Sequence, residues 1–328
     1  MRGSQTSATS IAVLVPCLNE EAAIGKVVRD FREALPTAAV YVFDNGSTDR
    51  TIEVAREAGA RVRVEPLRGK GNVVRRMFAD VEADVYVLVD GDATYDASES
   101  PKLINQLLRD GLDMLNVARV TKVQAAYRPG HRFGNVLLTG IVGWIFGRRV
   151  KDMLSGYRVF SRRFVKSFPA MASGFETETE LTVHALELRM PIAEVEAAYL
   201  DRPAGSASKL NTFRDGWRIL RTIANLAREE RPLAFFSLIS AALLLSAGAL
   251  SVPLLITYLE TGLVPRFPTA ILSTGLSILA FLSFVCGLVL DTVTRGRREL
   301  KRLHYLSVPS AQHTLAQVDE PLREGHAA

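Results

Sequence analysis

Two long apolar runs near the end of the chain constrain its fold more than any other feature of the sequence. Residues 233–259 and 268–290 contain no charged side chain. Each run is long enough to form a tilted transmembrane helix. The link between them is short, and Glu260 and Arg266 are its charged residues. We therefore expect two transmembrane helices within residues 232–292; the alternative is a buried helical hairpin of a soluble protein.

Basic residues gather on both outer flanks of this hairpin, although the formal net charge of the 328-residue chain is only +5. They are Arg221, Arg228 and Arg231 before it, and Arg295, Arg297, Arg298, Lys301 and Arg302 after it. Cytosolic segments beside membrane helices are enriched in Lys and Arg. We therefore expect an integral protein of the plasma or inner membrane with both termini in the cytosol. The small charge excess indicates no nucleic-acid partner, and its position fits an anionic lipid bilayer.

The segments on either side of the hairpin are polar or amphipathic. Residues 211–231 place apolar side chains on one stripe with arginines around it, as in a helix that lies on a membrane surface. A surface helix packed on its own domain is the alternative. Residues 1–10 lack the apolar core of a secretory signal, so we expect a flexible N-terminus. Residues 293–328 are expected to form a basic and then disordered cytosolic tail.

The two cysteines agree with a cytosolic location of the first domain. Cys17 falls in an expected buried strand, and Cys286 falls inside the second apolar run. A disulfide between them would join a soluble core to a membrane segment. Both are therefore expected to be free thiols in a reducing compartment.

Residues 11–118 alternate between strand-like and helix-like hydrophobic periods. The expected strands are 11–17, 40–43, 62–64, 85–89 and 114–118, and the expected helices are about 20–35, 71–81, 100–109 and one that is capped at 47–49 and ends near Gly59. This alternation predicts an α/β domain with a mainly parallel sheet and helices on both faces. Ligands of such sheets bind at the carboxyl ends of the strands.

The strongest candidate for a chemical site is Asp90-Gly91-Asp92, which directly follows the apolar strand 85–89. Two carboxylates in this position can converge on Mg²⁺ or Mn²⁺ together with phosphate oxygens of a substrate. Such a cation neutralises the charge that builds on a departing diphosphate. The alternative is an acidic turn without a metal.

Three further junctions between a strand and a helix carry polar side chains. Asp44 opens an Asp-Asn-Gly-Ser-Thr-Asp run that predicts an Asx-type turn, and its carboxylate could also accept from a ring N–H of uracil or guanine. Pro16 and Glu20 are the first and last residues of a Pro-Cys-Leu-Asn-Glu turn. Lys70 stands between two glycines at an expected helix N-terminus, so it is either a phosphate partner or a solvated loop lysine.

Together these four junctions resemble the inverting family 2 glycosyltransferases of GT-A fold, in the order P-x-x-N-E, D-N-G-S-T-D, G-K-G and D-G-D. The segment from Asp152 to Arg158 (DMLSGYR) is similar to the D-x-x-S-G-[FY]-R segment of the dolichyl- and polyprenyl-phosphate sugar synthases. Residues 202–209 resemble the R-x-x-G-x-S-K stretch of that branch, with an extra residue or so. The resemblance covers about residues 11–210, and the hairpin matches the two-helix anchor of the bacterial members in kind.

The resemblance implies a role for each matching residue. The nucleobase and ribose would be held by Pro16, Glu20 and Asp44. Metal and donor diphosphate would be bound by Asp90 and Asp92, with Lys70, Arg202 and Lys209 near the donor phosphates. The acceptor phosphate would be bound by Arg119, Arg128 and Arg132, of which Arg128 and Arg132 belong with Asp90 and Asp92 to the catalytic set. The pocket floor would be shaped by Ser155, Gly156 and Arg158.

The chain departs from the family pattern at two positions. Many members have Gln as a further metal ligand two residues after the second Asp, where this chain has Thr94. The aromatic residue often found in P-x-Y-N-E is replaced by Leu18. These departures put a third protein ligand and base stacking in doubt.

The resemblance implies a nucleotide-sugar donor, UDP- or GDP-linked, and a polyprenyl phosphate acceptor. The expected reaction is a single in-line displacement with inversion at the anomeric carbon, for assembly of a cell-envelope glycan or glycoconjugate. One alternative is a membrane glycosyltransferase that acts on a glycolipid or polysaccharide. Another is a non-catalytic membrane scaffold that binds nucleotide sugars. Family members often assemble through the hairpin, so a homo-oligomer is expected.

Overall fold

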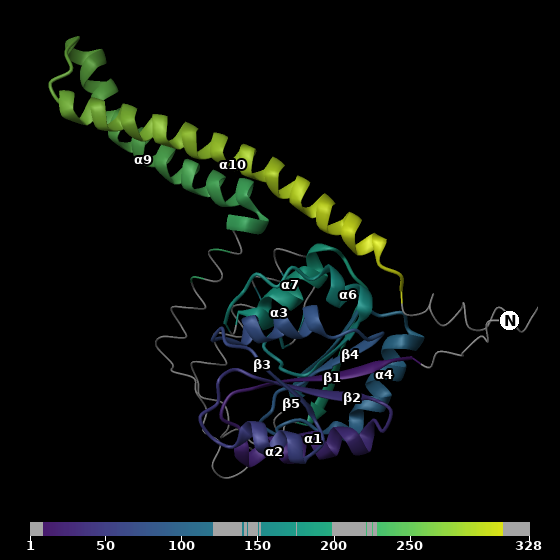
Figure 1. The fold of residues 1–328 in the computed structure, drawn as a ribbon. Coiled ribbons are helices and arrows are strands. Elements are labelled where there is room, and N and C mark those ends of the chain that lie inside the picture. The colour runs from purple at the N-terminus through teal and green to yellow at the C-terminus, as the bar shows by residue number, and fades with distance from the viewer. Residues whose placement is uncertain are drawn as a thin grey trace, which may run out of the picture. The chain divides into compact units, whose positions relative to one another are not determined.

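A computed structural model describes two compact parts of the chain (Figure 1). The described residues are 9–120, 152–174, 176–198 and 228–310, with the single positions 140, 143, 150, 221 and 225. The first unit, called the catalytic unit below, comprises residues 1–216 and 301–328, and the second, called the hairpin unit, comprises 217–300. Most of the expected interface helix, 211–231, lies outside the described residues.

The catalytic unit is built on one seven-stranded sheet with the order β3-β2-β1-β4-β6-β5-β7. The strands are β1 (Ile11–Cys17), β2 (Ala39–Asp44), β3 (Arg61–Val64), β4 (Val85–Leu88), β5 (Met114–Val120), β6 (Arg158–Ser161) and β7 (Ile192–Ala198). Neighbouring strands are parallel except where β6 pairs with β4 and β5. The expected mainly parallel sheet is therefore confirmed, with one reversed strand near its centre.

Helices cover both faces of this sheet (Figure 1). They are α1 (Glu21–Ala34), α2 (Thr51–Glu57), α3 (Lys70–Asp80), the 3-10 helix η1 (Ala97–Glu99), α4 (Ser100–Arg109), α6 (Arg162–Ser167) and α7 (Thr177–Glu187). Side chains of α1, α2 and α4 pack on one face, and those of α3, α6 and α7 pack on the other. The strand-helix alternation in the sequence predicts this three-layer arrangement, since parallel strands need crossover connections.

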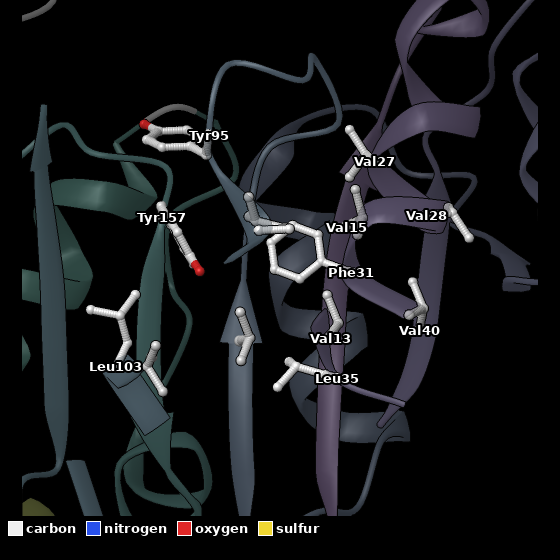
Figure 2. Packing of buried hydrophobic residues seen from close by; sticks show 14 of the residues in the cluster. Val13, Val15, Val27, Val28, Phe31, Leu35, Val40, Tyr95, Leu103 and Tyr157 are labelled. Carbon is white, nitrogen blue, oxygen red and sulfur yellow. The ribbon is translucent and has the colours of Figure 1, made fainter. Parts of the chain in front are cut away.

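The two hydrophobic layers follow from the alternation of side chains along each strand. Val13 and Val15 of β1 point into the layer under α1, whereas Ala12 and Leu14 point into the layer under α3. In the first layer Phe31 packs edge-on against the ring of Tyr157, with the ring centroids 6.1 Å apart (Figure 2). Both faces are buried, which explains why β1 and β4 read as continuous apolar runs rather than as alternating ones.

The hairpin unit contains the two expected apolar helices, α9 (Pro232–Thr261) and α10 (Phe267–Ser307). By length and composition both could span a membrane. Small residues lie where the helices meet: Ser273, Ala280, Gly287 and Thr294 are the buried residues of α10 and recur every seventh position. A Cβ atom added at Gly287 would lie 3.0 Å from the Cβ atom of Phe236. Close packing of small residues is how membrane helices associate without a hydrophobic driving force between them.

Helix α10 continues beyond residue 290, where the expected span ends, to Ser307. The basic part of the expected tail, from 293 to 307, is thus helical, and residues 311–328 lie outside the described residues. The apolar pattern ends at residue 290, but helix propensity does not, because Arg, Glu, Leu and Lys are good helix formers. Asp291 and Arg295, which lie one helical turn apart, form an ion pair that supports the helix, with 2.9 Å between Oδ2 and Nη2.

The end of α10 belongs to the catalytic unit. The hydroxyl of Tyr305 donates a 2.6 Å hydrogen bond to Oδ2 of Asp113, at the start of β5. Nζ of Lys301 lies 2.7 Å from Oε2 of Glu187, the last residue of α7. The sheet domain is therefore completed by residues that follow the hairpin in the sequence.

Candidate active site

Four predicted acidic residues gather at the carboxyl ends of β1, β2 and β4. Cys17 is the last residue of β1 and lies beside Asp44, the last residue of β2. Burial raises the pKa of the Cys17 thiol, and the negative charges of Glu20, Asp44, Asp90 and Asp92 raise it further. All four carboxylates are therefore within electrostatic range of one buried atom. This is the convergence that the strand-helix junctions predict.

Asp44 has one satisfied and one unsatisfied carboxylate oxygen. Oδ2 accepts hydrogen bonds from the backbone N–H groups of Gly46, at 2.8 Å, and Ser47, at 2.9 Å. These bonds form the expected Asx-type turn. Oδ1 is buried without a hydrogen-bond partner among the described residues. A buried acceptor without a donor is uncommon in a native fold, and it suits a ligand that carries an N–H group.

The turns after β1 and β2 are locked to each other. The backbone N–H of Asn19, a residue with a φ of 52°, donates to Oγ of Ser47 at 2.8 Å. The backbone N–H of Glu20 donates to Oγ1 of Thr51, also at 2.8 Å. Pro16 lies in β1 beside β2, and it is half-buried like Glu20. These bonds fix Pro16, Glu20 and the Asp44 turn as one wall of the site.

Asp90 and Asp92 offer oxygen ligands of the kind that hard divalent cations prefer. Asp92 is buried, and its Oδ1 accepts from the Thr94 hydroxyl at 2.6 Å and from the Thr94 backbone N–H at 3.3 Å. The Asp90 side chain is about one-third exposed (32%), so solvent and ligands can reach it. Thr94, which replaces the family's Gln, thus orients Asp92.

Among the described residues no cluster of three or more His, Cys, Asp or Glu side chains could hold a metal ion. Water and substrate oxygens are suited to complete the coordination of a cation at Asp90 and Asp92. Mg²⁺ is commonly bound in this way, through one or two carboxylates and substrate phosphates. The donor set fits Mg²⁺ or Mn²⁺.

Lys70 lies between two carboxylates. Its Nζ is 2.6 Å from Oδ1 of Asp90 and 2.6 Å from Oε1 of Glu178. Burial on its own would lower the pKa of Lys70, but the charges of Asp90 and Glu178 outweigh this effect and raise the pKa above its usual value. The lysine is therefore a permanent cation beside the predicted metal ligands, and not a solvated loop residue.

The glycines on either side of Lys70 permit a close backbone approach. A Cβ atom at Gly69 would lie 2.1 Å from the carbonyl oxygen of Ser173, and one at Gly71 would lie 2.2 Å from that of Ala172. Gly69 also has a φ of 122°, which side chains rarely allow. The G-K-G pattern thus places the start of α3 directly against the loop before α7.

Ser155, Gly156 and Arg158 form a buried support next to Asp90. A Cβ atom at Gly156 would lie 2.0 Å from Oδ2 of Asp90. The backbone N–H of Gly156 donates to the Tyr95 hydroxyl at 2.9 Å, and the Ser155 hydroxyl donates to the carbonyl of Val117 at 2.5 Å. These contacts bring the segment before β6 to the same edge of the sheet as the acidic residues.

Arg158 is fully buried, and its guanidinium holds the backbone of this segment. It donates to the carbonyl oxygens of Met153, at 2.6 Å, and Ser155, at 3.2 Å, and to Oγ1 of Thr182, at 2.9 Å. Burial lowers the pKa of Arg158, while Glu178 and other nearby anionic groups oppose the shift. A buried guanidinium with these partners fixes a loop rather than binding a ligand directly.

Arg119 of β5 forms a two-pronged ion pair with Asp152. Its Nε and Nη2 lie 2.7 Å and 2.9 Å from the two carboxylate oxygens. Burial alone would raise the pKa of Asp152, but hydrogen bonding to Arg119 and its charge lower the pKa. Arg119 also lies within electrostatic range of Tyr95, which borders Asp90 through Gly156. In the strand order, β5 with Arg119 and β2 with Asp44 lie on opposite sides of β1 and β4.

Four predicted residues lie outside the described part of the chain: Arg128, Arg132, Arg202 and Lys209. Conversely, sequence reasoning missed Glu178 and Tyr95. Glu178 stands in a run of alternating Glu and Thr, in which nothing distinguishes it from Glu176 or Glu180. Only the fold shows that Glu178 is the one that reaches Lys70.

The sheet order, the two helical layers and the acidic edge are those of a GT-A glycosyltransferase. The family model for glycosyl transferase family 2 matches residues 12–167. Glycosyltransferase AglJ of Haloferax volcanii is 34% identical over 233 residues, which is 69% of this chain and 75% of that protein. The chain therefore belongs to glycosyl transferase family 2.

Two further proteins extend this comparison. A dolichyl-phosphate hexose transferase of Haloferax volcanii is 32% identical over 221 residues, which is 67% of this chain and 95% of that protein. Glucosyl-3-phosphoglycerate synthase of Mycobacterium tuberculosis, crystallised with Mn²⁺, UDP and glucosyl-3-phosphoglycerate, superposes with a TM-score of 0.54 at 26% identity. The superposition covers 67% of this chain and 79% of that one.

Proposed function

We propose that this chain is a membrane-anchored inverting glycosyltransferase that transfers a sugar from a UDP- or GDP-linked donor to polyprenyl phosphate. The observation that carries the proposal is the gathering of Glu20, Asp44, Asp90 and Asp92 around Cys17 at one sheet edge. The same chain has two helices apolar enough to span a membrane. The dolichyl-phosphate hexose transferase to which it is similar supports a lipid phosphate as acceptor.

In this proposal the nucleotide lies along the edge formed by β1 and β2. The unpartnered Oδ1 of Asp44 accepts the ring N–H of the base, and Pro16 and Glu20 complete the wall. Lys70 supplies a positive charge to the donor phosphates from the N-terminus of α3, where backbone N–H groups favour anions. Arg202 and Lys209 are proposed to reach the same phosphates.

Asp90 and Asp92 are proposed to hold Mg²⁺ or Mn²⁺ together with the donor diphosphate. The complex of the similar synthase with Mn²⁺ and UDP supports a divalent cation. Bound there, the cation neutralises the charge of the leaving nucleoside diphosphate. The backbone of Gly156, which donates to the Tyr95 hydroxyl, packs against Asp90 and limits the positions that its carboxylate can take.

The acceptor phosphate needs no strong general base. Its second pKa is about 6, so it is largely a dianion near neutral pH. Arg128 and Arg132, together with Arg119, are proposed to bring this anion to the anomeric carbon from the face opposite the diphosphate. A phosphate oxygen then forms the new bond as the donor C–O bond breaks, which inverts the configuration.

The hairpin is proposed to anchor the enzyme with its catalytic unit and both termini in the cytosol. This orientation rests on the arginines that flank the two apolar runs. An assembly of several copies through α9 and α10 is part of the proposal. The product, a lipid-phosphate-linked sugar, would feed the assembly of cell-envelope glycans.

The test is a transfer assay with the full chain purified in detergent. Polyprenyl phosphate, Mn²⁺ and a panel of UDP- and GDP-sugars are supplied, and the lipid fraction is analysed for a sugar phosphodiester. We expect one donor to give a product that disappears with Asp92→Ala, while that variant stays folded and membrane-bound. Transfer only to a glycolipid or polysaccharide would replace the proposed acceptor. Nucleotide-sugar binding without hydrolysis or transfer would favour the non-catalytic scaffold.

A further inference from the structure

Lys70 is shared between a predicted metal ligand and a carboxylate that has no place in the proposed reaction. Glu178 lies in the first turn of α7 and is buried. One of its oxygens, Oε1, pairs with Lys70, and the other, Oε2, is buried without a partner among the described residues. A buried carboxylate is costly unless it is paired, and Lys70 is an ion-pair partner of Glu178 in this place.

The backbone around this ion pair is rigidly set. The N–H of Gly71 donates to the carbonyl of Ser173 at 3.2 Å, so the start of α3 is tied to the loop before α7. A Cβ atom at Gly71 would lie only 2.5 Å from Oγ1 of Thr177, the residue before Glu178. The helix that carries the lysine and the helix that carries the second carboxylate therefore meet at their first turns.

Asp90 has two competing uses in this arrangement. Its Oδ1 accepts the ammonium of Lys70 at 2.6 Å, yet Asp90 is also a proposed ligand of the divalent cation. A cation at Asp90 repels Lys70 and takes electron density from the same carboxylate. If Lys70 had only Asp90 as partner, the ammonium would compete with the cation for that oxygen.

We propose that Glu178 is a positioning residue that retains Lys70 when the cation engages Asp90. It gives the lysine a second anchor, and thereby frees Asp90 for the metal while Lys70 stays beside the donor diphosphate. This inference rests on the proposed function, because it takes Asp90 as a ligand of Mg²⁺ or Mn²⁺. It assigns to α7 a role in metal binding, although α7 contributes no ligand.

The test is a titration of Mn²⁺ binding to the full chain in detergent, in the presence of UDP and, separately, of GDP. Free Mn²⁺ is followed by its electron paramagnetic resonance signal, which needs neither acceptor nor turnover. For Glu178→Gln we expect the Mn²⁺ dissociation constant to rise about 10-fold to 100-fold, the range found when partners of metal ligands are removed. Lys70 then has only Asp90 and competes with the metal.

The double variant Lys70→Met with Glu178→Gln separates this competition from simple loss of structure. At saturating nucleotide we expect its Mn²⁺ dissociation constant to be lower than that of Glu178→Gln, because no ammonium remains at Asp90. A double variant that binds as weakly as Glu178→Gln would overturn the proposal, and so would wild-type binding by Glu178→Gln itself.

Glu180→Gln is the matched control. Glu180 lies on the same helix, but its oxygens accept from the backbone N–H groups of Met171, at 2.8 Å, and Ala172, at 2.9 Å. We expect its Mn²⁺ binding to match the wild type; weakening equal to that of Glu178→Gln would overturn the proposal. Failure of the lipid-transfer assay alone would reject the proposed acceptor and leave the Mn²⁺ result standing.

Discussion

The two units of this protein treat polar groups in opposite ways. The catalytic unit buries charged side chains and gives them defined partners, such as Lys70 between Asp90 and Glu178. The hairpin helices carry no charge in their apolar spans, and their hydroxyls bond to backbone carbonyls, as Ser240 does to Ala280 at 2.7 Å. In the catalytic unit the proposed activity depends on individual charged atoms. In the hairpin unit the packing of the helices depends on the small size of the buried residues. Substitutions in the catalytic unit should therefore leave membrane retention unchanged, and substitutions in the hairpin unit should leave the charged contacts of the site unchanged.

The largest effect is expected for Asp90→Asn. The change keeps the shape of the side chain but removes the charge that faces Lys70 and the proposed cation. We expect turnover to fall about 10³-fold, as when a main electrostatic contact to the transition state is lost. The measurement is sugar transfer by purified protein, with membrane retention tested by alkaline extraction. Loss of membrane retention would break the separation between the two units.

A smaller loss of turnover is expected for Gly156→Ala. The added Cβ atom would lie 2.0 Å from Oδ2 of Asp90 and must displace that carboxylate. A shift of this size costs about 10²-fold in rate. The control is Gly275→Ala in α10, where nothing lies within 4 Å of the added atom, and which should transfer sugar at the wild-type rate. Equal rates for the two variants would contradict the tight contact at Asp90.

In the hairpin unit, the size of a substituted side chain is expected to matter more than its charge. Gly287→Leu places a large side chain against Phe236 and Leu233, whose nearest atoms lie 3.0 Å and 3.4 Å from an added Cβ atom. Overpacking of this kind lowers the free energy of unfolding by about 1–3 kcal/mol. Thermal unfolding in detergent should show this loss for Gly287→Leu and none for Gly275→Leu. A stable Gly287→Leu protein would mean that α9 and α10 are not packed through this residue.

The smallest effect concerns a buried histidine outside the site. Burial lowers the pKa of His184 to about 3, and the positive charge of Lys301 contributes. The unfolded chain, with a pKa of about 6.5 at this residue, binds the proton that the folded chain excludes. Stability is therefore retained above pH 6.5 and is lost as the pH falls from there toward 3, by up to about 1.4 kcal/mol per pH unit.

The check on His184 is the free energy of unfolding at pH 7.5 and pH 5.5. The wild type should lose about 1.4 kcal/mol between these values through this residue, and His184→Gln should lose that much less. An identical pH dependence in both proteins would show that His184 already accepts a proton in the folded state.

The sequence predicted the catalytic sheet well because its strands are buried on both faces. The apolar runs ending at Cys17 and Leu88 leave little choice of structure, and each is followed by polar residues at the carboxyl edge of the sheet. The order of the motifs then placed Asp44, Asp90 and Asp92 together, and the charges around Cys17 agree.

Features set by tertiary contacts were not predictable. The four residues of β6 do not reveal that this strand runs against its neighbours. The helical continuation of α10 from residue 291 to Ser307 was not predicted, because an apolar pattern marks a membrane-length span and not the helix that extends beyond it. Glu178 was missed because its role depends on how close Gly69 and Gly71 let another loop approach.

The position of Glu178 in the chain also bears on how the enzyme is made. Strands β1, β2 and β4 precede α7 in the chain and can associate before it through short crossovers, since domains fold from the N-terminus during synthesis. The ion pair between Lys70 and Glu178 can form only after α7 has been synthesised. The proposed nucleotide edge therefore stays incomplete until α7 has been synthesised and has packed against α3, and α7 precedes the two helices that could span a membrane.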